Sequence, residues 1–302
     1  MTQDDTISAD WIAVDWGTSN MRAWAMSASG TVLAEAASDQ GMGKLTRDGY
    51  EPALLEVARN WIDGPTTVIA CGMVGSRQGW TEAPYATVPC QTLPEGLVRA
   101  PTTHPDLTVF VIPGIKQTNP ADVMRGEETQ ISGFLARNPG WDGVICLPGT
   151  HTKWAHISAD EVVSFQTYMT GELFAAIASQ TVLRHSIAAD GWDKAAFNDG
   201  LDLGLTRPER IAARLFSLRA NSLLNGLSGQ AARAQLSGLL IGAELAAARP
   251  YWLGQKIAVI GGSHLSGLYI QALATQAVPA TQVNASAITL AGLTAAYQRL
   301  KG

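Results

Sequence analysis

The segment Trp11–Asn20, WIAVDWGTSN, contains the pattern on which the fold prediction rests: a short apolar run followed by a glycine turn with hydroxyl side chains. Two later segments repeat this pattern, GVICLPGTHT at Gly143–Thr152 and KIAVIGGSHLSG at Lys256–Gly267. Short runs rich in β-branched residues that end in glycine predict buried strands entering tight turns. The three segments therefore predict three strand-and-turn units along the chain.

Helical patterns lie between these strands. EPALLEVARNWI after Gly49 is amphipathic, and DVMRGEETQISGFLARN puts Ile131, Phe134 and Leu135 on one helical face. AQLSGLLIGAELAAARP is apolar on most of its circumference and stops before Pro250, which predicts a buried helix. TTVIACGMVG and LTVFVIPG are further strand candidates, whereas ADGWDKAAFNDGLDLG is expected to be loop-rich surface structure. Alternating strands and helices predict an α/β fold.

The chain is predicted to form two related domains. Its 302 residues fit two domains at about 150 residues each. The first two glycine turns align at Gly17 with Gly149 and at Thr18 with Thr150, as expected for corresponding turns of two halves. The stretch RNPGWDG contains Pro and Gly and is a favourable place for a domain boundary. A boundary within it gives domains 1–138 and 139–302.

Composition excludes several classes of protein. Hydrophobic residues make up 46% and charged residues 16%, which is typical of a globular chain, and the net charge of -5 argues against a broad basic surface for nucleic acid. No run of about 18 apolar residues predicts a membrane span. Three scattered cysteines and a polar, acidic first ten residues favour a reducing, cytoplasmic setting without a secretory signal.

Familiar catalytic signatures are absent from the sequence. It contains no GxxxxGK[ST], GxSxG, HExxH or GxGxxG pattern, and its five histidines lack the spacing of zinc ligands. The positive signal is Asp15, at the end of a predicted buried strand and before Gly17, Thr18 and Ser19. One interpretation is an ordinary hairpin turn. The other is a phosphate-binding hairpin in which glycine admits an anion, hydroxyls donate to it and Asp15 orients Mg²⁺.

Further residues fit the phosphate interpretation. Arg22 supplies a charged donor close to the first turn. The second turn carries Gly149, Thr150 and His151, with Lys153 after them, and would hold the other side of a polyphosphate. The third turn, at Gly261, Gly262 and Ser263, suits the base and ribose of a nucleotide, because a flat ring packs closely where side chains are missing.

At this point the chain resembles the 2-dehydro-3-deoxygalactonokinase family. DWGTSNMRAW, GMVGSRQGW, APY, VMRGEETQISG, PGTHTKW, MTGEL and LSGLLIGAE occur in the order typical of these bacterial sugar-acid kinases. The resemblance implies two ribonuclease-H-like domains of the actin-like ATPase superfamily, with ATP and sugar in the cleft between them. It also implies Mg²⁺-dependent transfer of the ATP γ-phosphoryl group to the 6-hydroxyl of 2-dehydro-3-deoxy-D-galactonate.

The resemblance also implies roles for the turns. Asp15, Gly17, Thr18 and Ser19 match the first phosphate loop of the superfamily, and Gly261 and Gly262 match its adenosine motif. Gly149, Thr150 and His151 match the second phosphate loop, although Leu147-Pro148 stands where an aspartate is common. This departure leaves Asp15 as the clearer candidate to organise magnesium.

Glu127 and Glu128 open the predicted helix whose apolar face includes Ile131 and Leu135. Either carboxylate could point toward the packed side of that helix. Alternatively, both interact only with the helix dipole, as acidic residues in a first turn often do. The resemblance favours a catalytic role, in which one carboxylate accepts the proton of the sugar hydroxyl. We prefer Glu128 to Glu127 for this base.

A sugar acid also needs contacts to its carboxylate and hydroxyls. Arg125 adjoins the glutamates and offers a forked donor. The alternative for Arg125 and for Arg77 is a plain surface position, which we expect for Arg77. MTGEL would form a second substrate loop through Thr170 and Glu172, unless Glu172 only caps the helix that follows. The first substrate loop, which could instead be a plain strand-to-helix turn, comprises Gly72, Met73, Val74, Gly75 and Ser76.

Three alternatives remain open from the sequence. The acceptor could be the gluconate-derived epimer of the sugar acid. The chain could also be an exopolyphosphatase-type phosphatase, although it is not basic enough to favour one, or an ATP-binding sugar sensor that transfers no phosphate. The Glu127–Glu128 pair favours the kinase. The pattern indicates no oligomeric state.

Overall fold

The computed structural model describes residues 7–302, and it divides into two compact units. Unit 1 consists of Met1–Trp141, Ile157–Ser164 and Ala285–Gly302, and unit 2 of Asp142–His156 and Phe165–Asn284. Met1–Thr6, which belong to the polar segment argued above to lack a secretory signal, lie outside the described residues. No helix within residues 7–302 is long and apolar enough to cross a membrane.

The domain boundary differs from the predicted linear division at 138/139. The chain leaves unit 1 at Trp141, close to the predicted point, but it returns to unit 1 with Ile157–Ser164 and with the C-terminal segment Ala285–Gly302. The reason is packing, because this helix is continuous with the core of unit 1 through Leu293, Ala296 and Tyr297. A linear division cannot represent a terminal helix that belongs to the first unit.

Unit 1 is built on a six-stranded mixed sheet with the order β3-β2-β1-β4-β8-β7. The first three strands are antiparallel neighbours, and β1, β4 and β8 run parallel. The strands are β1 (Trp11–Trp16), β2 (Met21–Met26), β3 (Val32–Ser38), β4 (Thr66–Gly72), β7 (Val98–Arg99) and β8 (Leu107–Val111). The carboxyl ends of β1 and β4 therefore lie side by side in the middle of the sheet.

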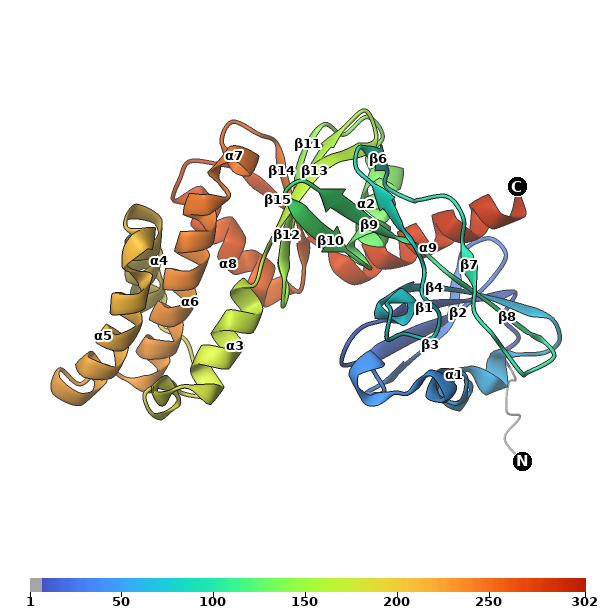
Figure 1. Ribbon diagram of the computed structural model, residues 1–302, viewed down its shortest axis with the longest axis horizontal. Coiled ribbons are helices and arrows are strands. Elements are labelled where there is room, and N and C mark those ends of the chain that lie inside the picture. The colour runs from blue at the N-terminus through green and yellow to red at the C-terminus, as the bar shows by residue number, and fades with distance from the viewer. Residues whose placement is uncertain (1–6) are drawn as a thin grey trace. The chain divides into compact units, whose positions relative to one another are not determined.

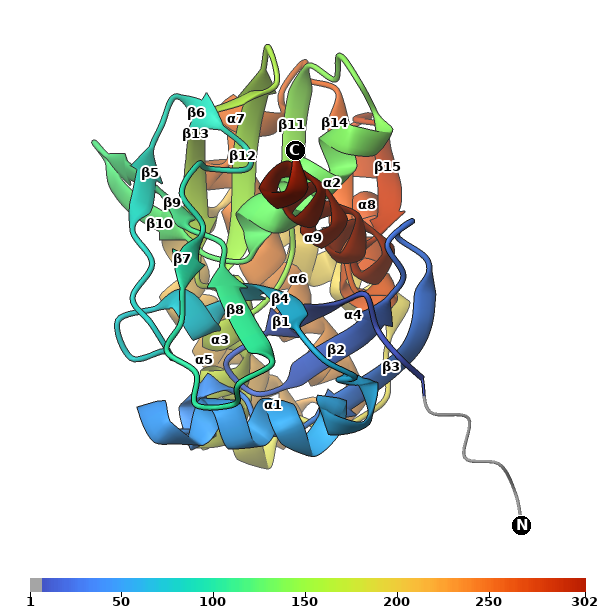
Figure 2. The same ribbon diagram turned by 90° about the vertical axis from the view of Figure 1, so that its right-hand side faces the viewer.

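Helices cover both faces of this sheet (Figure 2). Alternate residues of β1 point to opposite faces, so Ile12, Val14 and Trp16 join the core beneath α1 (Tyr50–Ala58). Trp11 faces the other way and stacks on Tyr297 of α9 (Ala285–Lys301), with the ring centroids 4.4 Å apart. The central strand is buried on both sides, which explains why its sequence is almost continuously apolar.

Helix α2 (Glu127–Arg137) is fixed against α9 by two glycines. A Cβ at Gly133 would lie 2.0 Å from Ile288 O, and one at Gly292 would lie 2.0 Å from Thr129 O. The two backbones thus pack in direct contact, which holds the start of α2 in place. A small sheet, β10-β9-β5, leads into α2 through β5 (Tyr85–Thr87), β9 (Gly114–Thr118) and β10 (Ala121–Met124).

The third sheet has the order β15-β14-β11-β12-β13-β6. Leaving out β6, its order around β11 repeats that of unit 1 around β1, since β13-β12-β11-β14-β15 corresponds to β3-β2-β1-β4-β8. The hairpin tip Ile157–Ser164, which pairs with β6, is the part of this sheet assigned to unit 1. The strands are β6 (Cys90–Gln91), β11 (Gly143–Leu147), β12 (Thr152–Ser158), β13 (Glu161–Tyr168), β14 (Ile257–Gly261) and β15 (Ala280–Asn284).

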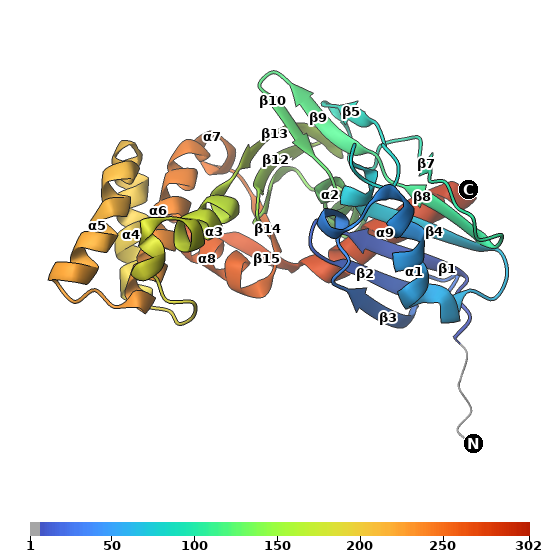
Figure 3. The same cartoon turned by 60° about the horizontal axis from the view of Figure 1, so that its bottom comes forward.

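The expected loop-rich stretch at 189–204 is wrong from Lys194 onward. Residues Lys194–Thr206 form helix α4, which packs side by side with α6 (Gly229–Ala247; Figures 1 and 3). Gly200 and Gly204 of α4 meet the α6 backbone so closely that a Cβ at either would lie 2.3 Å from a carbonyl oxygen. Glycines that indicated a loop thus serve close helix packing. The remaining helices of unit 2 are α3 (Thr170–Gln180), α5 (Ile211–Leu224), α7 (Arg249–Trp252) and α8 (Ser263–Ala274).

Candidate active site

The first glycine turn is the tight hairpin between β1 and β2. Gly17 N–H donates to Asn20 O at 2.9 Å, and Thr18 and Ser19 are exposed at the tip. The loop Gly41–Gly43 supports the turn from behind, since a Cβ at Gly41 would lie 2.2 Å from the carbonyl carbon of Ser19. Sequence reasoning missed this support, because GMG looks like any glycine-containing loop. The hydroxyls at the tip remain open to solvent.

Asp15 lies just before this turn, where its register neighbours are Arg22 on β2 and Cys71 on β4. Arg22 Nη2 donates to Asp15 Oδ2 at 2.7 Å, and Arg22 Nη1 donates to Ser286 Oγ at 2.5 Å. The Cys71 thiol is 3.9 Å from Asp15 Oδ1 and is a weak donor. The predicted anion donor Arg22 is therefore an ion-pair partner of Asp15, which leaves Oδ1 as the less engaged carboxylate oxygen.

Glu128 is fully buried at the start of α2. Its Oε2 accepts from Gly126 N–H at 2.6 Å and its Oε1 accepts from the Thr129 hydroxyl at 3.1 Å. Burial, followed by the neighbouring charge of Glu127, raises the pKa of Glu128 to about 8. A carboxyl group with a pKa near neutral is a typical general acid or base.

Cys71 shows that Asp15 and Glu128 share one neighbourhood. Burial raises the pKa of the Cys71 thiol well above its usual value, and the charges of Asp15 and Glu128 raise it further. Cys71 is the register neighbour of Asp15, and a Cβ at Gly126, two residues before Glu128, would lie 3.2 Å from Gly72 Cα, so the backbone brings the end of β1 and the start of α2 together. The structure brings these two predicted residues together although they are far apart in the sequence.

Glu127 has a different environment from Glu128. It is half-buried, and its Oε2 accepts from the Arg125 backbone N–H at 3.1 Å. The two glutamates therefore do not share a role: Glu128 points into the protein beside Cys71, and Glu127 holds the turn that enters the helix.

Arg125 is buried, with 9% of its surface exposed, although a surface position was the alternative for it. Its guanidinium lies 4.3 Å from the centre of the Tyr85 ring, and its Nη2 donates to Ala83 O at 2.7 Å. Its Nε and Nη1 have no hydrogen-bond partner. Two donors of a buried cation are thus available for an anion.

The loop predicted to bind the sugar adjoins Arg125. Met73–Gly75 form a single 3₁₀ turn after β4, and a Cβ at Gly75 would lie 2.7 Å from Arg125 Nη1. The Ser76 hydroxyl is buried beside this turn without a hydrogen-bond partner. Arg77 is exposed, as expected. The loop therefore adds a second unpaired polar group near the Arg125 guanidinium.

Unit 2 contains a cavity of about 340 Å³ beside the second glycine turn. Gly149, Thr150 and Thr170, which the sequence indicated, line one side of it. Sequence reasoning missed the aromatic and basic residues of the other walls, since isolated aromatic residues predict core packing more often than a site. These residues are Phe174, Trp192, Arg233 and His264.

The start of α3 is locked onto the second turn. A Cβ at Gly171 would lie 2.3 Å from Gly149 O, and Glu172 N–H donates to Thr150 O at 2.9 Å. The Glu172 carboxylate lies 2.5 Å from His151 Nε2. The Glu172 backbone thus ties this helix start to the second turn, while its carboxylate engages His151 and makes no cap hydrogen bond.

The remaining predicted residues of unit 2 lie at the edges of this cavity or behind it. Lys153 is buried within β12. Gly261 ends β14 with its Cα facing Pro148 and Ser266, and Gly262 is open, since a Cβ there would meet nothing within 4 Å. Ser263 begins α8, which supplies His264, Leu265 and Leu268 to the cavity wall.

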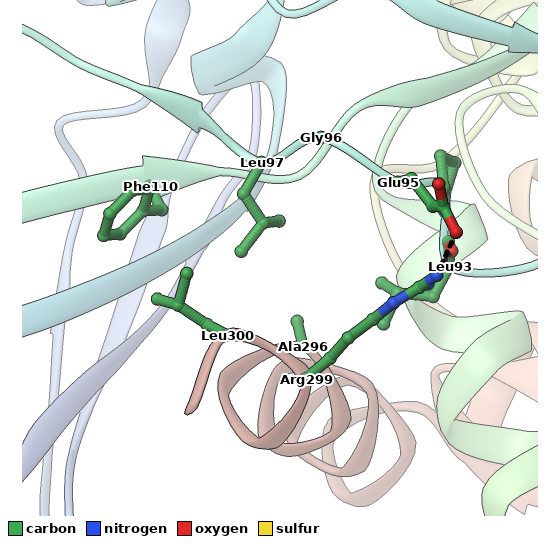
Figure 4. A pocket seen from close by; sticks show the side chains of 9 residues that line it. Leu93, Glu95, Gly96, Leu97, Phe110, Ala296, Arg299 and Leu300 are labelled. Carbon is green, nitrogen blue, oxygen red and sulfur yellow. Dashed lines mark hydrogen bonds and ion pairs between the residues drawn. The ribbon is translucent and has the colours of Figure 1, made fainter. Parts of the chain in front are cut away.

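A second cavity, of about 290 Å³, lies in unit 1 between the segment Leu93–Leu97 and the end of α9 (Figure 4). It is lined mainly by apolar side chains. Its charged groups are already engaged, because Arg299 donates to Leu93 O at 2.8 Å and to Glu95 Oε1 at 2.9 Å. No predicted site residue lines it. Within residues 7–302, no cluster of three or more His, Cys, Asp and Glu side chains could hold a metal ion.

Two sheets with the same strand order, each with a glycine turn after its first strand, define the class as an actin-like ATPase fold. The structure resembles component A of the (R)-2-hydroxyglutaryl-CoA dehydratase of Acidaminococcus fermentans, with a TM-score of 0.55 and 13% identity over 98% of this chain and 100% of that one. At this identity the likeness concerns the fold alone.

The family is shown by closer relatives. Residues 15–296 match the model of the 2-keto-3-deoxy-galactonokinase family. The chain is 40% identical to the 2-dehydro-3-deoxygalactonokinase DgoK1 of Rhizobium meliloti (strain 1021), over 98% of this chain and 99% of that protein. It is 34% identical to the 2-dehydro-3-deoxygalactonokinase of Escherichia coli (strain K12), over 95% and 97%.

A crystal structure described as a 2-dehydro-3-deoxygalactonokinase protein from Sinorhizobium meliloti matches with a TM-score of 0.89, at 38% identity and over 96% of each chain. The chain belongs to the 2-keto-3-deoxy-galactonokinase family, kinases that phosphorylate an alcohol group of a sugar acid in galactonate catabolism. The resemblance noted in the sequence is therefore confirmed for the family and for the fold.

The environment of Glu128 predicts how stability depends on pH. Its pKa is about 8 in the folded protein and near 4.5 in the unfolded chain, so the folded state binds the extra proton between these values. The stability that this group contributes is present below pH 4.5 and is lost as the pH rises toward 8. The amide of Glu128→Gln is neutral at every pH, so the variant does not lose this stability as the pH rises. We expect the free energy of unfolding of the variant to increase relative to wild type between pH 5 and pH 8, measured by urea denaturation. If the free energy of unfolding changes with pH in the same way in both proteins, the raised pKa of Glu128 is contradicted.

Proposed function

We propose that this chain transfers the γ-phosphoryl group of ATP to the 6-hydroxyl of 2-keto-3-deoxygalactonate, with Glu128 as the base. The observation that carries the assignment is that Asp15, Cys71 and the start of α2 meet at the adjoining ends of β1 and β4. It supplies one carboxylate that remains partly exposed and one whose pKa is about 8. Phosphoryl transfer needs mainly positioning and charge neutralisation, so few side chains suffice.

Glu128 acts by accepting the proton that the sugar hydroxyl loses as its oxygen bonds to phosphorus. A base must be deprotonated before it reacts, and the raised pKa makes the Glu128 carboxylate a stronger acceptor than an ordinary one. Gly126 N–H and the Thr129 hydroxyl hold its two oxygens in fixed positions. Glu127 has the separate task of fixing the turn before the helix.

Asp15 is proposed to hold Mg²⁺, directly or through a water molecule. Mg²⁺ in kinases is often bound by one or two carboxylates together with phosphate oxygens and water, so a single carboxylate fits this ion without a cluster of protein ligands. Asp15 Oδ1 has only the weak thiol donor of Cys71 as a partner. When bound, the ion would neutralise charge on the phosphates. Arg22 keeps the carboxylate in place through Oδ2.

The cavity of unit 2 is proposed to hold the nucleoside part of ATP. Its walls combine aromatic surfaces with a cation, because the Arg233 guanidinium lies 5.1 Å from the Phe174 ring centre and Trp192 packs edge-on against His264. Flat rings bind well to such surfaces. Gly149 and Thr150 of the second phosphate loop line this cavity and would receive phosphate oxygens. Gly17, Thr18 and Ser19 are proposed as the first phosphate loop.

Arg125 is proposed to bind the carboxylate of the sugar acid. Its Nε and Nη1 both lack a hydrogen-bond partner. Open donors of a buried guanidinium form charge-assisted hydrogen bonds with carboxylate oxygens. The Ser76 hydroxyl, also unpaired, and the side-chain-free Gly75 next to Nη1 leave polar and steric room for a substrate group. Gly72, Met73 and Val74 complete this substrate loop.

Asp15→Asn tests the magnesium role. The change is nearly isosteric but removes the negative charge, so we expect kcat to fall by about two orders of magnitude. The Mg²⁺ concentration that gives half-maximal rate should rise. Arg22→Gln is the control, because it breaks the same ion pair and keeps the carboxylate. If Arg22→Gln shifts the Mg²⁺ requirement as far as Asp15→Asn does, the ion pair and not a metal accounts for the effect.

Glu128→Gln tests the base, with ADP release in the presence of ATP and the sugar acid as the assay. We expect kcat to fall about 10²–10⁴-fold, since this is the usual contribution of a positioned general base. The rise of kcat/KM with pH toward 8 should disappear, while the KM for ATP changes little. Glu127→Gln is the matched control and should be the milder change. If the two variants rank in the opposite order, Glu127 is the base.

Arg125→Gln tests recognition of the acid. Losing a buried charged hydrogen-bond pair typically costs about 2–5 kcal/mol, so the KM for the sugar acid should rise by at least about 30-fold. The KM for ATP should stay near the wild-type value. Wild type should strongly prefer the acid to its carboxamide, and the variant should lose most of that preference. Arg77→Gln, at an exposed arginine near the same loop, is the control. A variant that still discriminates the carboxamide would place the carboxylate elsewhere.

A further inference from the structure

Unit 2 contains a second buried carboxylate that the proposed reaction does not use. Glu244 lies on α6 and is 3% exposed. Its Oε1 accepts from Trp154 Nε1–H at 2.8 Å, and its Oε2 accepts from the Tyr269 hydroxyl at 2.7 Å and from the Thr170 hydroxyl. Three donors from three different elements thus meet one side chain.

The direction of these hydrogen bonds is determined by chemistry. The indole N–H can only donate, so Oε1 must accept from it. The single hydroxyl proton of Tyr269 is given to Glu244, so the Thr152 hydroxyl, 3.0 Å from the Tyr269 oxygen, must donate to that oxygen. Thr152 thus donates to Tyr269, and Tyr269 donates to Glu244. All hydrogen bonds of the network form only when both carboxylate oxygens of Glu244 accept.

This network connects directly to the walls of the unit 2 cavity. Thr170 and Tyr269 both line it. Thr170 begins α3, and the next residue, Gly171, packs on Gly149 O of the second glycine turn. Thr152 and Trp154 lie on β12, the strand that leaves this turn. Glu244 therefore joins α6, α3, α8 and β12 behind the groups that face the cavity.

We propose that Glu244 is a positioning residue for nucleotide binding, which holds the start of α3 and the Tyr269 wall in the arrangement that receives ATP. The inference rests on the proposed function of this cavity. It assigns Glu244 no contact with the nucleotide, since its carboxylate is covered by its three donors. Its effect is to keep Thr170, Gly171 and Tyr269 in register with the turn at Gly149.

The energetics support a specific role for this carboxylate. Burial raises the pKa of Glu244 to about 7, while the hydrogen bonds from Thr170, Trp154 and Tyr269 oppose this shift. A buried charge is unfavourable unless such donors compensate it, and apolar residues of similar volume often stabilise a core better. The carboxylate therefore serves mainly to fix the orientation of four elements. It contributes less to the stability of the fold.

Glu244→Gln tests the proposal by calorimetric titration with a non-hydrolysable ATP analogue. The side-chain amide replaces one accepting oxygen by an NH₂ donor and removes the charge, so the Tyr269 and Thr170 hydroxyls can no longer both donate as they do to the carboxylate. We expect the Kd for the analogue to rise roughly 10- to 100-fold, the range for one hydrogen bond to a charged group. In the kinase assay the KM for ATP should rise similarly, while the KM for the sugar acid should stay within about twofold.

Two further variants keep the test decisive. Tyr269→Phe removes a single hydroxyl from the network and should weaken analogue binding in the same direction, and it replaces Glu244→Gln if that variant does not fold. Leu245→Ala, at the next residue of α6, creates a core cavity without touching the network. It should lower the melting temperature and leave the Kd near the wild-type value.

The outcomes separate the inference from the proposed function. If wild type does not bind the analogue, the proposed function of the cavity fails. If wild type binds it and the folded Glu244→Gln and Tyr269→Phe variants bind equally well, the positioning role of Glu244 is overturned. An equal loss of affinity in Leu245→Ala would also overturn it, because general destabilisation would then explain the effect.

Discussion

The close approach of three backbone segments at Gly72 determines the site of unit 1. Gly72 ends β4 with a φ of 91°, and a Cβ there would lie 2.6 Å from Trp16 O at the end of β1. Gly126, just before α2, approaches on another side, since its own Cβ would lie 3.2 Å from Gly72 Cα. A side chain at position 72 would displace the end of β1, and one at position 126 would move the start of α2 away from Gly72. Asp15, Cys71 and Glu128 are neighbours because this contact contains no side chain.

The two buried carboxylates show how the same residue type acquires different roles. Glu128 and Glu244 both have a raised pKa because burial removes water from the charge. Glu128 is held by one backbone N–H and one hydroxyl and is close to another acid, Glu127, so its ionised form remains unfavourable. Glu244 is held by an indole and two hydroxyls, which stabilise the ionised form. The first arrangement suits a group that takes up a proton, and the second suits a fixed acceptor.

Much of the fold was predictable because it depends on local patterns. The apolar runs at Trp11–Trp16, Gly143–Leu147 and Ile257–Gly261 are strands, and the apolar stripe of Ile131, Phe134 and Leu135 is buried along α2. The predictions that were wrong concern features that depend on contacts between residues distant in the sequence. The glycines of α4 indicate a loop to any local rule, because the α6 backbone that they pack against lies more than thirty residues away. The C-terminal helix likewise joined unit 1 through contacts with residues near the other end of the chain.

The candidate site was predictable in part for the same reason. Asp15 and Glu128 stood out by their positions at a strand end and a helix start, but only the three-dimensional structure distinguishes Glu128 from Glu127. It also separates two arginines that the sequence offered alike as anion donors. Arg22 is opposite Asp15 across an antiparallel pair, so its charge is already matched. Arg125 lies between a ring and a glycine turn with two donors unmatched. These open donors are the reason that Arg125, and not Arg22, is proposed for the carboxylate of the sugar acid.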